Sequence, residues 1–375
     1  MKLIVTVYSD PNETSITYSS ERGKGLSFGT QLPGGFDSCQ FSVPVSGWQA
    51  VRLYRLLLSK HLVVYDTWGR RVYEGRIEDV AVSKDGVEVE ALGYYSNADD
   101  LTAWTVYPVG NTKTVRDIII DAVDLSSLWR EDFSRIQANT QTIGPQEFTK
   151  ETKISDMINK ALTFGSDSIA IRRMHFAIWE NRIAHYYAEP SPDGGNYDWS
   201  VRIDSVTSDY SMSMSRKKVF NRQQAIYDDP YIGTSFTDWQ DDLGSQKIFG
   251  IREGTINVGS AMEEVADLAL SFSLRASAQP EQSTRFTISG TTKSKYGYMD
   301  ALYMIRAGQL LRVDDFDPSG IDLLTGSSGS DTAVAVITRT DYNAQENTLQ
   351  VDLGFNNIAM DLLMARLGLS GGAVN

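Results

Sequence analysis

The chain has 375 residues, of which 41% are hydrophobic and 22% charged, which is the composition of a globular protein with room for two or three domains. No apolar run reaches the roughly 18 residues that a membrane-spanning helix needs. The net charge of −13 disfavours tight binding to nucleic acid, because phosphate binding needs clustered Lys and Arg and the densest cluster here is only Arg216-Lys217-Lys218.

Residues 1–104 predict a first β domain. Strands are expected at 2–8, 14–18, 25–29 and 39–44, and one helical stretch at 48–58 interrupts them. Cys39 is the only cysteine, so no internal disulfide can form. It takes a core position in an alternating run, which indicates a buried and unreactive thiol.

Three consecutive strands over residues 62–92 give the clearest signal in the chain. The runs 62–65, 71–80 and 87–92 are rich in β-forming residues, and Asp85-Gly86 joins the last two. This dipeptide favours a tight hairpin, because both turn positions favour positive φ. Such a meander builds half of a small barrel or sandwich, and it suits a scaffold better than a cleft.

Residues 105–195 predict a mixed helical and β domain. One helix is expected after Thr114, a plausible N-cap with Asp117 three residues later, and a second after Thr152. The two share their apolar spacing, which fits either a duplicated unit or, preferably, two helices that pack alike. A hairpin over 175–187 and a linker-like loop at 190–195 close the domain.

Residues 196–375 predict a second β domain with one inserted helix, which a capping box at 260–263 opens. Strands are expected at 285–288, 309–313, 333–339 and 348–353, and an apolar segment at 358–369 precedes a short tail. The predicted fold class is therefore mainly β (α+β), in the order β domain, mixed insert, β domain.

The sequence supports no catalytic, cofactor-binding or metal-ligating assignment. The common nucleophile, zinc-protease and phosphate-loop motifs are missing, and the three histidines are His61, His175 and His185. The run Asp315-Phe-Asp317-Pro-Ser319 resembles the front of a calcium loop, but Gly326 stands where such a loop needs a glutamate, so a polar turn is the preferred interpretation. Paired aspartates at 228–229, 241–242 and 314–315 leave a carboxylate-based hydrolase as a minor alternative.

Two sets of residues resemble phage tail hub proteins. The first is Val63-Val-Tyr-Asp66, then Gly69, then Val72-Tyr-Glu-Gly75-Arg-Ile-Glu-Asp-Val80. The second comprises Ile305-Arg-Ala-Gly-Gln-Leu-Leu-Arg-Val313, Ala333-Val-Ala-Val-Ile-Thr-Arg-Thr-Asp-Tyr342 and Thr348-Leu-Gln-Val-Asp-Leu-Gly354. The chain is thus similar in order to the central hub of T-even phages and to the N-terminal hub part of tail-associated lysins.

The resemblance implies a non-enzymatic structural protein of the virion, located at a tail tip or baseplate and assembled in the host cytoplasm. Each subunit would carry two tube-type β-barrels, so that a homotrimer adapts the sixfold tail tube above to a threefold tip. Tip, needle or lytic proteins would bind below, and DNA or the tape-measure protein would pass through a channel without specific binding. The net charge of −13 would favour this passage if the acidic residues face the channel. No cofactor is implied, and the assembly would either have no lytic activity or receive it from a separate protein bound below.

A hub of this kind leaves apolar surface for its neighbours. The candidate interface residues are Trp239, Ile358, Leu362, Leu363 and Leu367. A distal tail ring or receptor-binding component is the main alternative, because it would share the β-rich character but not the threefold symmetry.

Overall fold

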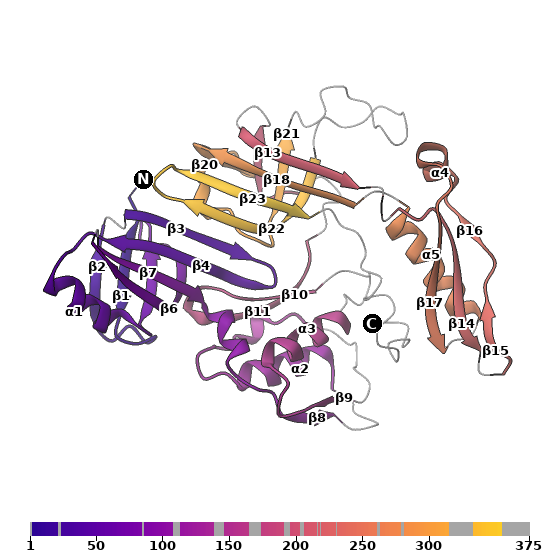
Figure 1. Ribbon diagram of the computed structural model, residues 1–375, viewed down its shortest axis with the longest axis horizontal. Helices are drawn as coiled ribbons and strands as arrows, with labels where there is room; N and C mark the ends of the chain where they lie inside the picture. Colours follow the sequence, from indigo (N-terminus) through magenta and orange to yellow (C-terminus); the bar gives the residue numbers. More distant parts are fainter. Residues whose placement is uncertain are drawn as a thin grey trace.

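The computed structural model describes residues 2–21, 24–84, 86–107, 113–138, 146–164, 174–190, 196–202, 206–215, 217, 219–229, 231–260, 263–278, 281–314 and 333–354. The protein is mainly β, which confirms the predicted fold class. Within these residues the strands form sheets of 17, four and two strands (Figure 1).

Seven strands make up the N-terminal sheet. They are β1 (Ile4–Tyr8), β2 (Ile16–Ser20), β3 (Lys24–Gln31), β4 (Gly34–Val43), β5 (His61–Tyr65), β6 (Arg71–Ser83) and β7 (Gly86–Gly93). Their pairings give the spatial order β2-β1-β5-β6-β7-β4-β3. The predicted meander at 62–92 is therefore present as β5, β6 and β7, and helix α1 (Trp48–Leu57) lies where the helical stretch was predicted.

Eight strands make up the C-terminal sheet. They are β12 (Trp199–Arg202), β13 (Val206–Ser215), β18 (Glu281–Ser289), β19 (Thr291–Ser294), β20 (Met299–Ala301), β21 (Leu310–Asp314), β22 (Ala333–Asn343) and β23 (Thr348–Gly354). Their spatial order is β20-β19-β12-β21-β22-β23-β18-β13.

Five strands follow the same antiparallel path in both sheets, since β5-β6-β7-β4-β3 corresponds to β21-β22-β23-β18-β13. The likeness extends to details. Both sheets have a register shift at the corresponding place, between Ile77 and Asp79 in one and between Ile337 and Arg339 in the other.

The backbone bonds beside this bulge are also the same. Ile77 donates its N–H to the carbonyl of Lys60 at 2.9 Å and accepts from the N–H of Ser59 at 2.9 Å. Ile337 donates to Gln309 at 2.9 Å and accepts from Gly308 at 2.7 Å. Ser59 and Gly308 both have positive φ, at 60° and 88°. The two sheets are thus related copies of one strand arrangement.

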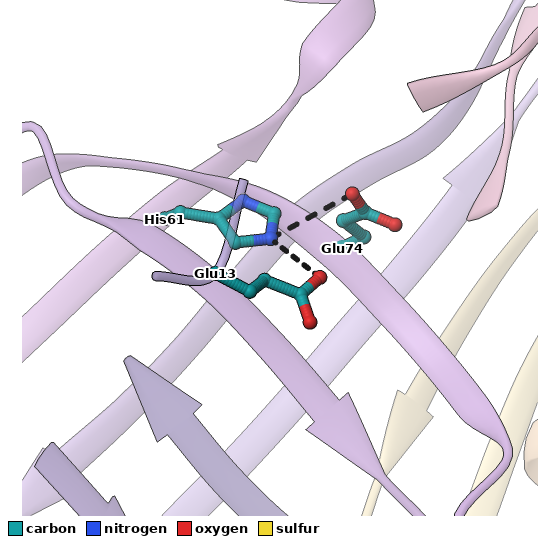
Figure 2. A group of neighbouring side chains, drawn as sticks. All are labelled: Glu13, His61 and Glu74. Atoms are coloured by element: carbon teal, nitrogen blue, oxygen red, sulfur yellow. Dashed lines mark ion pairs between the residues drawn. The ribbon is translucent and has the colours of Figure 1, made fainter. Parts of the chain in front are cut away.

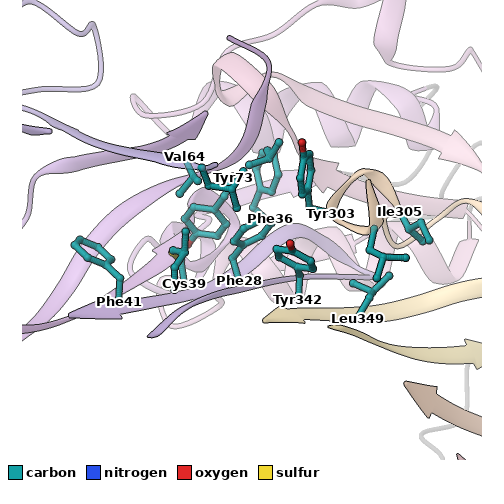
Figure 3. Close-up of a cluster of buried hydrophobic side chains, with 14 of the residues drawn as sticks. Phe28, Phe36, Cys39, Phe41, Val64, Tyr73, Tyr303, Ile305, Tyr342 and Leu349 are labelled. Carbon is teal, nitrogen blue, oxygen red and sulfur yellow. The ribbon is translucent and has the colours of Figure 1, made fainter. Parts of the chain in front are cut away.

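The two sheets join edge to edge, because β3 pairs with the second half of β22, from Arg339↔Gln31 to Asn343↔Ser27. In Figure 1, β3 lies directly beside β22. One hydrophobic core continues beneath the joint and contains Phe28, Tyr73, Tyr342 and Leu349 from the two sheets (Figure 3). Cys39 is buried in this core, as predicted.

A smaller mixed unit packs a second core below the N-terminal sheet (Figure 1). Its elements are β8 (Thr105–Tyr107), α2 (Val115–Asp124), β9 (Gln146–Phe148), α3 (Ile154–Phe164), β10 (Met174–Ile178) and β11 (Ala184–Ala188). Thr114 caps α2 and Asp117 returns the bond, so the predicted capping box is present. The predicted hairpin is β10–β11, and β10 also pairs in parallel with β4, which ties this unit to the large sheet.

Residues 219–278 form a separate body, which Figure 1 shows to the right of the other sheets. It contains β14 (Arg222–Asp229), β15 (Gly233–Phe236), β16 (Gln240–Asp241), α4 (Leu243–Phe249), β17 (Glu253–Ser260) and α5 (Glu263–Ser277). The sequence predicted only the long helix of this body. Its four strands went unnoticed because β15 and β16 are short and β14 and β17 are rich in polar residues. In addition, β14 pairs in parallel with β17 across a long connection.

Short 3-10 turns complete the described structure. They are Tyr94–Asp99, Phe133–Arg135, Glu180–Arg182 and Leu302–Met304. The described helices include none with the length and hydropathy required to span a bilayer.

Candidate assembly surfaces

One polar face runs without interruption across the joint between the two sheets. The registers place the following residues, one from each successive strand, in a single row: Asp79, Glu90, Gln40, Ser27, Asn343, Thr348 and Ser289. Neighbouring residues on the same strands point into the core, among them Phe28, Cys39 and Tyr342. The polar face, which carries this row, is directed away from the core and is available for solvent or a partner along both sheets.

The charge on this face differs between the two sheets. In the N-terminal sheet, Asp79 and Glu88 are exposed and Glu90 is half-buried. The register of β6 and β7 places Asp79 opposite Glu90, so the acidic side chains lie close together. In the C-terminal sheet the acids are matched by arginines, since Arg285 binds Asp352 at 2.5 Å and Arg339 binds Asp341 at 3.0 Å. The excess of negative charge on this face therefore belongs to the N-terminal sheet.

The second half of β6 presents an edge that has no strand beside it within the described residues. β5 pairs with β6 only from Arg71 to Arg76, and β7 alone accompanies Asp79–Ser83. The corresponding half of β22, Arg339–Asn343, has β3 on that side. Val82 on the open stretch is 46% exposed, whereas Tyr342, its counterpart on β22, is buried. An open strand edge with an exposed valine is a surface suited to pairing with another chain.

Helix α1 carries an exposed apolar stripe. Trp48, Val51, Tyr54 and Leu58 are all about half exposed or more, while Ala50 and Leu57 face the core. The sequence predicted a helix at this place, and the structure adds that these apolar side chains lie on its outside. Contiguous exposed apolar side chains on a helix indicate a surface that a partner covers.

The structure describes one of the five predicted interface residues. Trp239 lies between β15 and β16 in the separate body, is 37% exposed, and packs its ring 5.3 Å from the guanidinium of Arg222. Ile358, Leu362, Leu363 and Leu367 lie outside the described residues, as do Asp315, Asp317 and Ser319. Sequence reasoning missed the open edge of β6. The stretches 74–83 and 334–343 around the two bulges share only the isoleucine, so the sequence does not show that β6 and β22 correspond.

The paired aspartates that suggested hydrolysis serve local structure. Asp229 accepts from the N–H groups of Tyr231 and Ile232, and Asp242 accepts from the N–H of Ser245 as the N-cap of α4. Asp228 accepts from Thr234 at 2.8 Å and Asp241 lies 3.7 Å from Arg222. These four carboxylates are satisfied by turns, a cap and an ion pair.

The two histidines of the β10–β11 hairpin do not lie opposite each other. His175 lies opposite Tyr187, and His185 lies opposite Ala177. His175 bonds Glu189 at 2.8 Å, and burial together with the nearby Arg135 lowers the pKa of His185. His61 belongs to a different group, in which it is buried beside two glutamates.

Comparison with solved structures gives full-length matches. A tail protein from Neisseria meningitidis superposes with a TM-score of 0.62 at 12% identity, over 97% of this chain and 99% of that one. The chain has the fold of phage tail proteins. A 43 kDa tail protein of a Shewanella oneidensis prophage gives a TM-score of 0.59 at 10% identity, over 97% of this chain and 100% of that one. The prophage tail protein gp18 from Listeria monocytogenes gives 0.54 at 12%, over 98% of each chain.

No family model matches the sequence, and no curated protein matches it either. The likeness to phage tail proteins is therefore one of fold, which low sequence identity leaves intact because a fold depends on the pattern of buried residues more than on their identity.

Proposed function

We propose that the protein is a structural hub of a phage tail, at the baseplate or tail tip, in which three copies close a ring with six similar sheets. The observation that carries the proposal is the shared strand path and bulge of the two sheets, at Ile77 and Ile337. Two related sheets in one chain let a threefold ring present six similar units to a sixfold tube. The full-length match to phage tail proteins supports the same role.

The joint inside one chain indicates how neighbouring chains would meet. Inside the chain, Ser27–Gln31 of β3 pairs with Arg339–Asn343 of β22. The registers make Ser211–Ser215 of β13 the counterpart of the β3 segment, and Asp79–Ser83 of β6 the counterpart of the β22 segment. We propose that β13 of one subunit pairs with β6 of the next, with Met212 opposite Val82.

In such a ring the polar face would line the channel. Six sheets would place the row from Asp79 to Ser289 around the bore, with the acidic N-terminal sheets alternating with the charge-matched C-terminal sheets. Negative potential repels phosphate, so DNA would pass without specific binding. A neutral or basic bore in an imaged ring would contradict this part of the proposal.

The first experiment is the mass of the assembled protein, by light scattering and native mass spectrometry across a range of concentrations. A mass of three chains supports the hub. Six chains would favour a distal tail ring, and a monomer at all concentrations would remove the basis of the proposal. Imaging of the particle then gives the symmetry directly.

A cysteine cross-link tests the joint between subunits. In a Cys39→Ser background, Val82→Cys with Met212→Cys is expected to form disulfide-linked oligomers of up to three chains under mild oxidation. The matched control is Ala81→Cys with Met212→Cys, because neighbouring residues of a strand point to opposite faces and cannot both reach the same partner. Equal cross-linking of the two pairs would contradict the proposed register.

Charge on the open edge is expected to prevent assembly without unfolding the chain. Val82→Glu places a carboxylate at the joint, whereas Val106→Glu alters a valine of similar exposure on β8 and serves as the control. Gel filtration should show smaller particles for Val82→Glu alone, with both circular dichroism spectra unchanged. If Val82→Glu assembles as completely as Val106→Glu, the open edge of β6 is not part of the interface.

The remaining predicted interface residues stay part of the proposal. Leu363→Glu is expected to block assembly and leave the fold intact, and an unfolded variant would assign Leu363 to a core instead. Trp239, in the separate body, would contact a neighbouring baseplate or tail-tip protein. The proposal also keeps the predicted division into three domains, at residues 1–104, 105–195 and 196–375. It places the protein in the virion.

A further inference from the structure

Glu13, His61 and Glu74 converge at the junction between the N-terminal sheet and the tip of the β10–β11 hairpin. Figure 2 shows both carboxylates on the Nε2 side of the His61 ring, with Nε2 directed towards both. Nε2 lies 3.5 Å from Oε1 of Glu13 and 3.7 Å from Oε1 of Glu74. The ligand atoms of all three residues lie within 4.8 Å of one another.

Two of the converging atoms are buried without a hydrogen-bond partner. They are Nε2 of His61 and Oε1 of Glu74, whose side chains are 0% and 1% exposed. The separations are too long for charge-assisted hydrogen bonds, which measure about 2.7–2.9 Å. A buried polar atom without a partner is costly, and two that face each other across a small gap indicate a missing group between them.

The separations suit a metal ion. In a tetrahedral zinc site with bonds of about 2.0–2.1 Å, the ligand atoms lie about 3.4 Å apart. The observed separations of 3.5 and 3.7 Å need only a small inward movement. One imidazole nitrogen and two carboxylate oxygens form a common ligand set for zinc, and Glu13, with its side chain 24% exposed, leaves room for a water as fourth ligand.

The other side of each ligand is held in the way that metal ligands require. Nδ1 of His61 lies 2.7 Å from the hydroxyl of Tyr94, and a Nδ1–H bond to that oxygen would leave the Nε2 lone pair free for an ion. Oε2 of Glu74 accepts from the N–H of Asn181 at 2.7 Å, which fixes the carboxylate.

Two arginines stand close to the group. Arg71 donates to Oε1 of Glu13 at 2.7 Å and to Oε2 of Glu74 at 3.2 Å. Arg182 lies 5.9 Å from the Tyr94 ring and acts on His61 through its charge. Arg71 holds both carboxylates from outside. The positive charge of the two arginines opposes a cation, so the affinity is expected to be lower than at a site without them.

We propose that Glu13, His61 and Glu74 bind one divalent transition-metal ion, with zinc as the best fit, at the junction of the N-terminal sheet and the β10–β11 hairpin. The ion would join the 10–15 loop, strands β5 and β6, and through Asn181 the hairpin tip. Its role would be structural, because it fixes the mixed unit against the sheet. The proposal does not depend on the trimer.

The test uses the full-length, untagged protein after treatment with a chelator. Cobalt(II) chloride is titrated in, and the visible absorption of a four-coordinate cobalt site is followed. Zinc binding is measured by equilibrium dialysis, and the thermal midpoint is recorded with and without zinc. We expect one ion per chain, intense visible bands that zinc abolishes, and a rise in the midpoint. Absence of stoichiometric binding would overturn the proposal.

Variants locate the ion. Glu13→Gln changes a partly exposed loop residue, so the chain should fold, and we expect at least a tenfold loss of affinity. His61→Gln should abolish binding, although its burial makes it the less secure variant. His175→Asn is the control, because His175 pairs with one carboxylate, that of Glu189, and has no second carboxylate beside it among the described residues. This variant should bind zinc as tightly as the parent protein. Binding unchanged in Glu13→Gln, or lost equally in His175→Asn, would contradict the site.

Discussion

The hydroxyl of Thr30 on β3 lies 2.6 Å from the hydroxyl of Thr340 on β22, and both side chains are buried at the joint between the two sheets. Thr30 also accepts from the backbone N–H of Ala307 at 2.8 Å. A polar pair at the centre of an apolar joint fixes its register, because a slip of one residue would bury each hydroxyl without a partner.

Thr30→Val is therefore expected to lower the free energy of unfolding by about 1–3 kcal/mol, because it leaves the Thr340 hydroxyl and the Ala307 N–H buried without partners. The double variant Thr30→Val/Thr340→Val should cost less than the sum of the two single changes. Urea denaturation of the four proteins gives the coupling energy. Strict additivity would show that the two hydroxyls do not interact.

Arg306 links three parts of the protein. Its guanidinium lies 5.2 Å from the ring of Phe36 and 5.5 Å from that of Trp179, donates to the carbonyl of Arg71 at 3.1 Å, and pairs with Glu180. Arg306→Lys keeps the charge but loses the planar stacking and the forked donors, so a loss of about 1–3 kcal/mol is expected.

The matched control for Arg306→Lys is Arg285→Lys. Arg285 is 54% exposed and pairs with Asp352 at the surface, so its replacement should cost at most about 1 kcal/mol. Denaturation of both variants in low and high salt separates the contributions. A similar cost at the two sites would show that Arg306 acts as an ordinary surface charge.

Ser59 and Gly308 occupy the same position in the two sheets, and both have positive φ. Ser59→Gly should stabilise the protein by up to about 1 kcal/mol, since glycine adopts this conformation without the penalty of a side chain. Gly308→Ala should destabilise it, because a Cβ there would lie 2.5 Å from the hydroxyl of Tyr187. Thermal denaturation checks both signs, and a stabilising Gly308→Ala would contradict the structural equivalence.

His61 makes stability depend on pH. Burial holds its folded-state pKa at about 4, below the ordinary value of 6.5, so the unfolded chain binds more protons between these values. The stabilisation is present above pH 6.5 and is lost as the pH falls towards 4, by at most about 3 kcal/mol.

Glu74 opposes part of this loss, because burial raises its pKa and the folded state then gains a proton more readily than the unfolded chain. The measurement is urea denaturation of the metal-free protein at pH 7, 5.5 and 4.5. His61→Gln should flatten the decline over this range. An equally steep decline in the variant would assign the pH dependence to other groups.

The sequence predicted the elements whose signal is local. Alternation at Val87–Leu92 and the Asp85-Gly86 turn predicted β6 and β7, and the Thr114–Asp117 capping box predicted α2. Pairing between distant segments has no comparable signal. The joint of β3 with β22 and the parallel pair of β14 with β17 depend on tertiary packing and could not be found from spacing.

The same limit explains the candidate sites. Helix α1 was predicted because helical spacing is visible in the sequence, but the spacing does not tell which face of the helix is left outside. Glu13, His61 and Glu74 come from a loop and two strands, and they meet only because β1, β5 and β6 are neighbours in the sheet.

The body formed by residues 219–278 begins after Ser215 of β13 and ends before Glu281 of β18. These two residues are opposite each other in the β13–β18 pair. The corresponding place in the N-terminal sheet is the tight turn between Gln31 and Gly35. A whole folded module thus occupies the tip of a hairpin, where it leaves the ladder beneath it undisturbed. Exchange of this module for another would be a simple evolutionary route to new partners, and an engineer could use the same two anchor points to graft a foreign domain.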